Sequence, residues 1–468
     1  MLYFGKSMDE SGGVVGMPVD AAPAMHAAPS ATKEPGASVA VFGLGFVGLP
    51  LSLSFAMEGS RVYGVDVVPA LVDELKEGRS LHQESYQGRQ LEDILREQTK
   101  GGRFTATLDG GWAVSQADTV IVTVGVPVTA DGRPQFGPLT GALETIGKAL
   151  QPGQIVILRA TVVPGTTEDM AKPILEECSG LTAGVDFDLA YCPERIAEGR
   201  AFEEFRTMPT VIAGVTRDGA ERARRALGRV TREITVTDTL MAAELSKVIE
   251  NVQRDVNIAI VQELAAVCER SSVDVREVIA LANTHKRVHL LDPGPGVGGY
   301  CIPNALHYLR PLAQRVNLQL PTLEAARSTN AGVPDRIAEV AFAHARSLGL
   351  EPSEARYGVW GLAMKDFTND DRISPPMEIA HRLAQSGGEV RAFDPAVRRD
   401  HPYPAATAME AAEGSHVLLV LARQEGMDFD DDAPLKALAP GALVLDTRGA
   451  YRNHEERIKG LGLVYWAI

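Results

Sequence analysis

Near its start the chain contains a strand, a glycine-rich turn, a helix and a second strand in direct succession. The apolar run 38–42 leads into Gly-Leu-Gly-Phe-Val-Gly at 43–48, and a helical pattern follows over 49–58. A second strand is expected over 61–65, and it ends at Asp66. In this setting a G-x-G-x-x-G turn predicts a parallel, Rossmann-type sheet that binds a dinucleotide.

The residues of this turn suit NAD. Glycines permit the tight turn and let the pyrophosphate approach the backbone at the positive end of the helix. The carboxylate after the second strand would accept a hydrogen bond from the ribose 2′-hydroxyl and would repel a 2′-phosphate, so NAD is favoured over NADP. We therefore expect NAD as the cofactor, bound by Gly43, Gly45, Phe46, Val47, Gly48 and Asp66.

The composition limits the remaining possibilities. At 468 residues the chain has room for two or three domains, and 45% hydrophobic residues provide material for their cores. No apolar stretch approaches the ~18 residues of a membrane span. A formal net charge of −15 argues against general nucleic-acid binding, so an anionic substrate would need local arginine and lysine residues.

The first residues and the cysteines bear on processing and compartment. Residues 1–36 are rich in Ala, Gly, Pro and Ser and lack an apolar core behind a basic segment, which predicts a disordered or artificially added tail rather than a signal peptide. Cys178, Cys192, Cys268 and Cys301 are scattered without C-x-x-C spacing. We therefore expect no metal site and no disulfide framework, and we place the protein in the reducing cytoplasm.

Alternating strand and helix patterns continue as far as residue 232. The expected strands predict a doubly wound sheet, and they lie at 119–124, 154–158, 188–191 and 209–213. From residue 240 to about 330 the pattern turns helical, with apolar residues at three- and four-residue spacing. Its first helix is long enough to connect two domains and to pack against a partner subunit.

A second sheet is expected toward the C-terminus. A helical pattern covers 374–385, and strand signals lie at 357–362, 389–393, 416–421 and 442–445. The chain is thus expected to be an α/β protein with two Rossmann-like doubly wound domains joined by a long helix and a helical dimerisation core. The domains would span 37–232, 233–335 and 336–468. Two nucleotide-type domains imply two nucleotides, of which one is NAD and the other is part of the substrate.

A cysteine follows a glycine turn far downstream of the NAD motif. Residues 296–305 read Gly-Val-Gly-Gly-Tyr-Cys-Ile-Pro-Asn-Ala, so Cys301 stands beside backbone that a ligand can approach closely. A thiol there can attack a carbonyl carbon, and the thiohemiacetal of an aldehyde can give up a second hydride. Thiol and NAD together favour oxidation beyond an aldehyde. For an isolated cysteine, a small buried side chain beside a structural turn is the commoner explanation.

Six motifs follow one another along the chain. After the glycine turn they are the segments at 160–167, 193–199, 244–251, 296–301 and 365–372. In their residues and order they resemble the UDP-glucose/GDP-mannose dehydrogenase family, over roughly residues 38–466. The resemblance implies an NAD domain, a helical dimerisation core and a C-terminal nucleotide-sugar domain. It also implies oxidation of C6 of a hexose from alcohol to carboxylate with two NAD.

The resemblance also implies roles for single residues. Cys301 matches the nucleophile that traps the aldehyde and carries the thioester. Lys247 and Asn251 lie four apart on one helix face and match the pair that steadies the oxyanion at C6. Glu194 resembles the acid that activates water for thioester hydrolysis, and Thr161 resembles the hydroxyl that holds that water. Without these neighbours, Lys247 would be an ordinary solvated helix lysine.

Further positions are assigned to the two nucleotides by the same resemblance. Glu198 matches a second acid of the 193–199 loop, near the cofactor, and the loop of Val124 and Pro127 lies near the nicotinamide. Arg287 resembles an arginine that reaches the substrate across a subunit interface, which implies a homodimer. The remaining substrate-binding positions are Arg195, Gly298, Lys365 and Arg448. Taken singly, surface salt bridges would explain these cations equally well.

The chain departs from the family pattern at several positions near the site. Asn304-Ala305 replaces the usual X-Asp pair after the nucleophile, and Arg159-Ala160 replaces a Glu-Ser spelling. Val126 stands where threonine is common, and Tyr300 replaces a frequent His or Ser. Because the nucleophile and the lysine remain, we interpret the chain as an active enzyme whose chemistry is retuned.

The sugar and the reaction class remain open at the level of the sequence. The sequence of the 293–299 loop is more similar to that of the family branch that acts on UDP-N-acetylmannosamine and UDP-N-acetylglucosamine than to that of UDP-glucose dehydrogenases. UDP-glucose and release at another oxidation level are the alternatives. A non-catalytic nucleotide-sugar binder and a two-electron dehydrogenase of the 3-hydroxyacid type are rivals from other classes.

Overall fold

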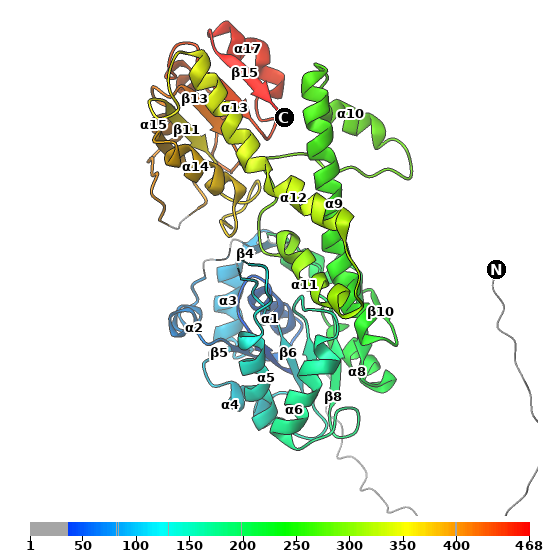
Figure 1. Ribbon diagram of the computed structural model, residues 1–468. Coiled ribbons are helices and arrows are strands. Elements are labelled where there is room, and N and C mark those ends of the chain that lie inside the picture. Colours follow the sequence, from blue (N-terminus) through cyan, green and yellow to red (C-terminus); the bar gives the residue numbers. More distant parts are fainter. Residues whose placement is uncertain (1–35, 81, 83, 130, 198, 398–399) are drawn as a thin grey trace, which may run out of the picture. The chain divides into compact units, whose positions relative to one another are not determined.

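Figure 1 shows the computed structural model, which describes residues 36–80, 82, 84–129, 131–197, 199–397 and 400–468. The predicted tail lies outside these residues except for Gly36. The N–H of Gly36 donates to the carboxylate of Asp118 at 2.8 Å, next to the first strand.

The first sheet has eight strands, in the order β10-β9-β8-β7-β6-β1-β2-β5. Neighbouring strands are parallel, except that β8 and β9 are antiparallel. The order reverses between β1 and β6, and ligands of open α/β sheets bind at such a reversal. The strands are β1 (Ser38–Phe42), β2 (Arg61–Val65), β5 (Phe104–Thr107), β6 (Thr119–Val122), β7 (Ile155–Leu158), β8 (Asp188–Tyr191), β9 (Thr210–Gly214) and β10 (Ile234–Val236).

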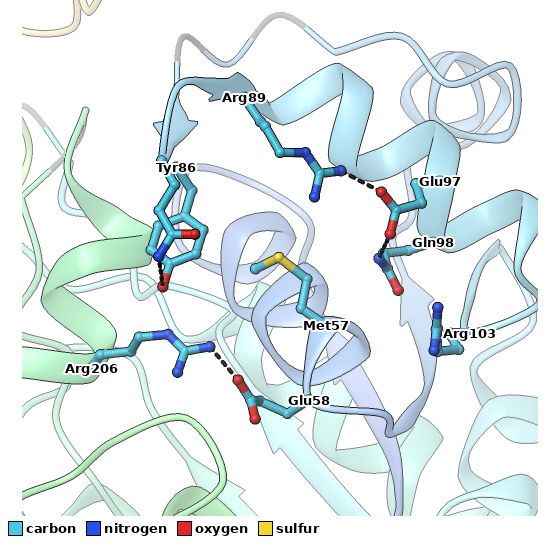
Figure 2. A pocket seen from close by; sticks show the side chains of 9 residues that line it. Met57, Glu58, Tyr86, Arg89, Glu97, Gln98, Arg103 and Arg206 are labelled. Atoms are coloured by element: carbon cyan, nitrogen blue, oxygen red, sulfur yellow. Dashed lines mark hydrogen bonds and ion pairs between the residues drawn. The ribbon is translucent and has the colours of Figure 1, made fainter.

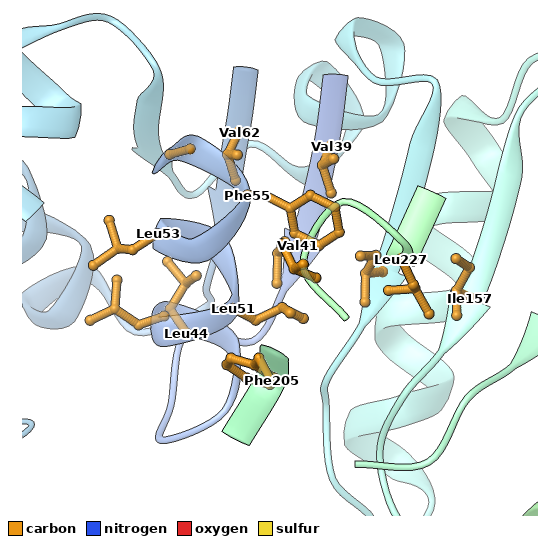
Figure 3. Close-up of a cluster of buried hydrophobic side chains, with 14 of the residues drawn as sticks. Val39, Val41, Leu44, Leu51, Leu53, Phe55, Val62, Ile157, Phe205 and Leu227 are labelled. Atoms are coloured by element: carbon orange, nitrogen blue, oxygen red, sulfur yellow. The ribbon is translucent and has the colours of Figure 1, made fainter. Parts of the chain in front are cut away.

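Both faces of this sheet are apolar and covered by helices. Alternate residues of a strand point to opposite faces. Val39 and Val41 therefore join one buried cluster, and Ala40 and Phe42 join the other. Figure 3 shows part of the first cluster, in which Phe55 and Leu51 of α1 meet the strands. The covering helices of this face are α1 (Gly48–Met57), α3 (Leu91–Lys100), α7 (Ala201–Thr207) and α8 (Arg217–Leu227).

The second face is covered by α4 (Gly110–Gln116), α5 (Gly137–Ala149) and α6 (Lys172–Ser179). Smaller elements complete this part of the chain. They are α2 (Pro69–Lys76), the antiparallel pair β3 (Ser85–Tyr86) and β4 (Arg89–Gln90), and the π-helical turn η1 (Thr167–Ala171).

A helical region follows the first sheet. Its first helix, α9 (Leu240–Arg270), has 31 residues and so is about 46 Å long. The buried carboxylate of Asp255 accepts hydrogen bonds from Arg327 and Asn330, which joins α9 to α12. The other helices are α10 (Val275–Ala282), α11 (Cys301–Arg315), α12 (Pro321–Ala331) and α13 (Val333–Ser347).

The second sheet is parallel throughout, in the order β12-β11-β13-β14-β15. Its order reverses between β11 and β13. Its strands are β11 (Arg356–Trp360), β12 (Glu389–Phe393), β13 (Val417–Val420), β14 (Leu443–Asp446) and β15 (Val464–Ala467). The accompanying helices are α14 (Pro375–Gln385), α15 (Ala408–Ala412), α16 (Ala433–Lys436), η2 (Arg452–His454) and α17 (Glu455–Gly460).

The expected fold class is confirmed, since two Rossmann-like parallel sheets flank a helical region that begins with a long helix. The structure adds the strands β5, β10 and β15, which the sequence did not indicate. Among the described residues, no helix is long and apolar enough to span a membrane.

Candidate active site

The glycine turn between β1 and α1 has the geometry that a dinucleotide needs. Gly43 has φ +89°, a conformation that favours glycine. A Cβ on Gly48 would lie 1.7 Å from the carbonyl oxygen of Gly43, so the helix packs directly on the turn. A Cβ on Gly45 would meet no atom within 4 Å, which leaves open space above the turn. The turn therefore fits a pyrophosphate at the N-terminus of α1.

Asp66 lies at the end of β2, next to this turn. Its carboxylate accepts hydrogen bonds from the N–H of Leu44 at 2.8 Å and of Val68 at 3.1 Å. The acid is therefore fixed beside the glycine turn, where a ribose hydroxyl would reach it.

The other expected cofactor residues lie around the same turn. Val124 follows β6, and its side chain would lie 3.4 Å from a Cβ on Gly43. Pro127 lies three residues farther along that loop, and its carbonyl accepts from Gln135 at 2.6 Å. The ring of Phe46 lies 4.6 Å from that of His82, and Val47 is the N-cap of α1. Glu198 lies outside the described residues.

Cys301, Lys247 and Asn251 come together although fifty residues separate Asn251 from the cysteine. The side-chain amide of Asn251 donates to the carbonyl of Cys301 at 3.3 Å. Lys247 lies one turn earlier on α9. Cys301 is exposed and is the first residue of α11. An exposed sulfur beside a buried amine and a buried amide can receive a carbonyl substrate.

Lys247 is buried, with only 4% of its surface exposed. Burial lowers the pKa of Lys247 from 10.5, although the thiol of Cys301 and the carboxylates of Glu250 and Glu194 oppose the shift. Among the residues that the structure describes, no side chain accepts a hydrogen bond from its amine. A lysine in this environment can be neutral and can serve as a base.

The position without the usual carboxylate is part of the core. Ala305 is fully buried in the cluster that contains Leu158 and Val248. The side-chain nitrogen of Asn304 is buried and has no hydrogen-bond partner among the described residues. On the next turn of α11, the hydroxyl of Tyr308 donates to the carbonyl of Val126 at 2.7 Å, which joins this helix to the loop after β6. Lys247 therefore has no carboxylate neighbour from α11.

Glu194 is held by a buried cation. Its carboxylate accepts from Nε of Arg159 at 2.7 Å, and the two side chains are 9% and 3% exposed. Thr161 lies two residues beyond Arg159, in the loop after β7, and its hydroxyl makes no hydrogen bond to the described residues. Arg195 bonds the carbonyl of Pro209 at 2.8 Å and also pairs with Glu250. The structure thus gives Arg195 partners within the protein and leaves the hydroxyl of Thr161 available.

The glycine loop before Cys301 rests on the segment after β11. A Cβ on Gly298 would lie 2.6 Å from Pro375 and 2.7 Å from the carbonyl of Ile373. The N–H of Gly299 donates to the carbonyl of Arg372 at 3.1 Å. A Cβ on Gly294 would lie 2.7 Å from the guanidinium of Arg448. The loop therefore requires glycine for close contact with protein as well as with a ligand.

Two arginines meet Asp366 at the carboxyl ends of β11, β13 and β14. Arg448 donates two hydrogen bonds to the carboxylate of Asp366, at 2.9 and 3.0 Å, and the side chain of Arg423 donates a third at 2.7 Å. Although burial opposes the shift, these arginines hold the pKa of Asp366 below its usual value. Lys365 is exposed beside them. Arg423 was not predicted from the sequence, although its position just after β13 puts it at the same edge.

Arg287 is not brought to the other residues within one chain. It is exposed, and its side chain forms no hydrogen bond or ion pair with the described residues. Its backbone N–H donates to the ring of His285 at 3.3 Å.

A surface pocket lies away from these groups. It has a volume of about 330 Å³ and is lined by Met57, Glu58, Arg103 and Arg206, among others (Figure 2). Met57 ends α1 and Arg103 precedes β5, so this pocket lies at the amino ends of the strands. The glycine turn and the strand-end loops lie at the carboxyl ends, and we place the active site there.

Comparison with known proteins identifies the family. Three models of the UDP-glucose/GDP-mannose dehydrogenase family match the chain, namely the NAD binding domain over 37–231, the central domain over 241–332 and the UDP binding domain over 358–453. The chain belongs to the UDP-glucose/GDP-mannose dehydrogenase family. It is an NAD-dependent nucleotide-sugar dehydrogenase, and the resemblance seen in its motifs is confirmed.

Individual members of the family are similar over most of their length. UDP-N-acetyl-D-mannosamine dehydrogenase of Pyrococcus horikoshii is 34% identical over 363 residues, which are 78% of this chain and 84% of that protein. The solved structure of a UDP-D-ManNAc dehydrogenase from the same organism has a TM-score of 0.82 and 29% identity, with 92% and 99% of the two chains covered. A UDP-glucose dehydrogenase from Pyrobaculum islandicum has a TM-score of 0.79 and 26% identity, with 94% and 99% covered.

Proposed function

We propose that the protein oxidises C6 of a UDP-N-acetylhexosamine to the uronic acid in two successive NAD-dependent steps. The observation that carries this proposal is the exposed Cys301 at the start of α11, beside the buried Lys247 and Asn251. A two-electron dehydrogenase of the 3-hydroxyacid type has no use for such a thiol or for a second Rossmann-like half.

The first oxidation needs a base for the C6 hydroxyl. Lys247 takes this proton in its neutral form, whose population burial increases. NAD, bound at the glycine turn, supplies the hydride acceptor in both oxidations. Asn251 steadies the oxygen at C6, because its amide already points toward Cys301.

The second oxidation needs the substrate to be bound covalently. The sulfur of Cys301 attacks the aldehyde carbon, and Lys247 returns a proton to the oxygen to complete the thiohemiacetal. Loss of the second hydride and of the hydroxyl proton leaves a thioester. Water then attacks the thioester carbonyl, the C–S bond breaks, and the sulfur leaves with the electron pair. Glu194 and Thr161 serve this hydrolysis.

The nucleotide and the sugar would be held by the second sheet and the glycine loop. Lys365 and Arg448, with Arg423 beside them, supply positive charge at the carboxyl ends of three neighbouring strands. The N-acetylhexosamine is favoured because the loop at 293–299 resembles that branch and because the Pyrococcus relatives are named for UDP-N-acetylmannosamine. UDP-glucose is the second candidate, since the Pyrobaculum structure of similar fold is named for it.

We further propose a homodimer in which Arg287 completes the site of the partner subunit. The side chain of Arg287 is exposed and pairs with none of the described residues, which supports this proposal. We retain the cytoplasm as its compartment, because both NAD and nucleotide sugars are intracellular metabolites.

The test is a substrate screen followed at the NADH absorbance band. Purified protein and NAD are mixed with UDP-GlcNAc, UDP-ManNAc, UDP-Glc, UDP-GlcA or GDP-Man. We expect the highest kcat/KM with a UDP-N-acetylhexosamine. Binding of UDP-sugars without any NADH would instead identify a non-catalytic binder. A highest kcat/KM with UDP-Glc would identify a UDP-glucose 6-dehydrogenase.

A further inference from the structure

The water-activating acid of the proposed mechanism accepts hydrogen bonds at both of its carboxylate oxygens. One oxygen of Glu194, Oε2, accepts from Nε of Arg159 at 2.7 Å. The other, Oε1, accepts from the N–H groups of Arg195 at 2.6 Å and Ile196 at 2.9 Å. A carboxylate has about four acceptor sites, so one remains, and it belongs to Oε2.

Arg159 is itself held in place from several sides. It directly follows β7, and its backbone N–H donates to the carbonyl of Val122 at 2.8 Å. Its Nη1 lies 3.2 Å from the sulfur of Cys192, and its guanidinium lies 5.5 Å from the ring of Phe205. Burial opposes the charge, but the carboxylate of Glu194 and the thiol of Cys192 raise the pKa of Arg159. The guanidinium is therefore a fixed and permanent charge.

Other charged groups surround Glu194 as well. Lys247 faces it from α9, and Glu204 of α7 lines the same small cavity as Glu194 and Arg195. Glu204 is engaged with the N–H of Ala197 at 2.6 Å. Among the described residues, only Arg159 touches Glu194 with a charged group.

We propose that Arg159 is a positioning residue for the hydrolytic step, because its guanidinium holds Oε2 of Glu194 in place and leaves that oxygen one acceptor site for the water. This inference rests on the proposed function. In the step, the water oxygen bonds to the C6 carbonyl carbon and the C–S bond breaks. One water proton passes to Glu194, and the second is released with the carboxylate product. Thr161, two residues after Arg159, belongs to the same strand-end loop and offers its hydroxyl to the same water.

The test compares hydride transfer with hydrolysis in Arg159→Gln. Single-turnover kinetics report the NADH burst, and steady-state kinetics report acid formation from pH 5 to 9. We expect the burst to keep its amplitude of two NADH per site. A buried carboxylate without its cation binds a proton more readily. The fall of the steady-state rate at low pH, which we call the acid limb of the pH–rate profile, should therefore shift to higher pH by about one to three units.

Two further variants separate positioning from loss of structure. Arg159→Lys keeps the positive charge but loses the hydrogen bond from Nε. The rate of acid formation should therefore fall at least about tenfold, while the acid limb of the pH–rate profile stays at the same pH. Arg327→Gln is the matched control, because it also removes an arginine from its ion pair with a buried carboxylate, that of Asp255. It should lower stability without moving the profile.

Each outcome decides the inference. If Arg159→Gln does not fold, Arg159→Lys carries the decision, and an unchanged rate of acid formation overturns the inference. An unmoved acid limb in a folded Arg159→Gln overturns it as well, as does equal slowing of burst and steady state. Absence of NADH in the wild-type protein with every UDP-sugar would instead overturn the proposed function.

Discussion

At the scale of single residues, the candidate site joins groups in contrasting environments. Cys301 is exposed, whereas Lys247 and Asn251 are almost completely buried. A thiol must be reached by the sugar, but a lysine works as a base only when its surroundings disfavour its charge. The burial of Lys247 disfavours its charge, and with alanine at position 305 no carboxylate there opposes this effect.

Replacing the proposed nucleophile tests the covalent mechanism. Cys301→Ser should lower acid formation at least about a thousandfold, because a serine hydroxyl is a far poorer nucleophile than a thiolate near neutral pH. NAD affinity, measured by calorimetry, should be unchanged because the glycine turn does not contact Cys301. Acid formation at the parental rate would show that the thiol is not required.

The lysine predicts a dependence of stability on pH. The pKa of Lys247 in the folded protein lies below its value of 10.5 in the unfolded chain, so the unfolded chain binds more protons between these values. Stability contributed at this position therefore rises as pH increases through that window. Lys247→Met should be inactive but more stable than the parent at pH 7, with the difference shrinking toward pH 9.5. Thermal melts across this range measure it, with the exposed Lys459→Met as control. A constant difference in Tm at all pH values would contradict the assignment.

At the scale of elements, the glycines of the NAD turn have separable roles. Gly48→Ala forces a Cβ to within 1.7 Å of a carbonyl oxygen, so the free energy of unfolding should fall by about 3 kcal/mol or more. Gly45→Ala meets no atom within 4 Å and should leave stability nearly unchanged while weakening NAD binding. Urea titrations and NAD calorimetry on the two variants provide the comparison. Equal losses of stability in the two variants would contradict the separate roles assigned to Gly48 and Gly45.

The elements also show what a sequence can and cannot predict. Strands β1, β2 and β8 begin and end where their apolar runs predict, because buried parallel strands are nearly continuous apolar segments. The edge strand β12 also has its predicted bounds, although most of its residues are exposed or half-buried. An apolar run does not indicate the direction in which a strand runs, so the sequence did not predict that β9 is antiparallel to β8. Strand β5 lies at the edge of its sheet and contains two threonines, so it lacks a continuous apolar run. Strand β15 also lies at an edge, but its residues are apolar and could have been predicted as a strand.

The candidate residues were predictable from motifs, but their partners were not. Arg159 and Glu194 lie 35 positions apart, and Asp366 meets Arg448 across 82 positions. Such pairs depend on which strand ends lie side by side. The motif therefore predicted an acid at Glu194 without indicating the cation that holds it.

At the scale of the whole molecule, α9 presents an apolar stripe to solvent. Ile249, Ile260 and Val267 are 50%, 46% and 61% exposed, and their spacing of eleven and seven residues places them on one helix face. This stripe suits the proposed contact with a second copy of the chain.

Subunit mixing tests whether that contact completes the site. We expect Arg287→Ala and Cys301→Ser to be nearly inactive separately. In a mixed dimer, the intact cysteine of one chain and the intact arginine of the other would form a working site. Mixing the two variants should therefore restore activity, and Ile260→Glu in both chains should abolish the rescue and give monomers by light scattering. Rescue that survives in monomers, or no rescue in mixed dimers, would contradict a shared site.

The central claim is oxidation by four electrons through a thioester on Cys301. Its most direct test is the ratio of NADH to uronic acid after complete reaction of a limiting UDP-N-acetylhexosamine, with the product identified by mass spectrometry. We predict two NADH for each acid and no released aldehyde. One NADH for each product, with the sugar released as the aldehyde, would contradict the claim.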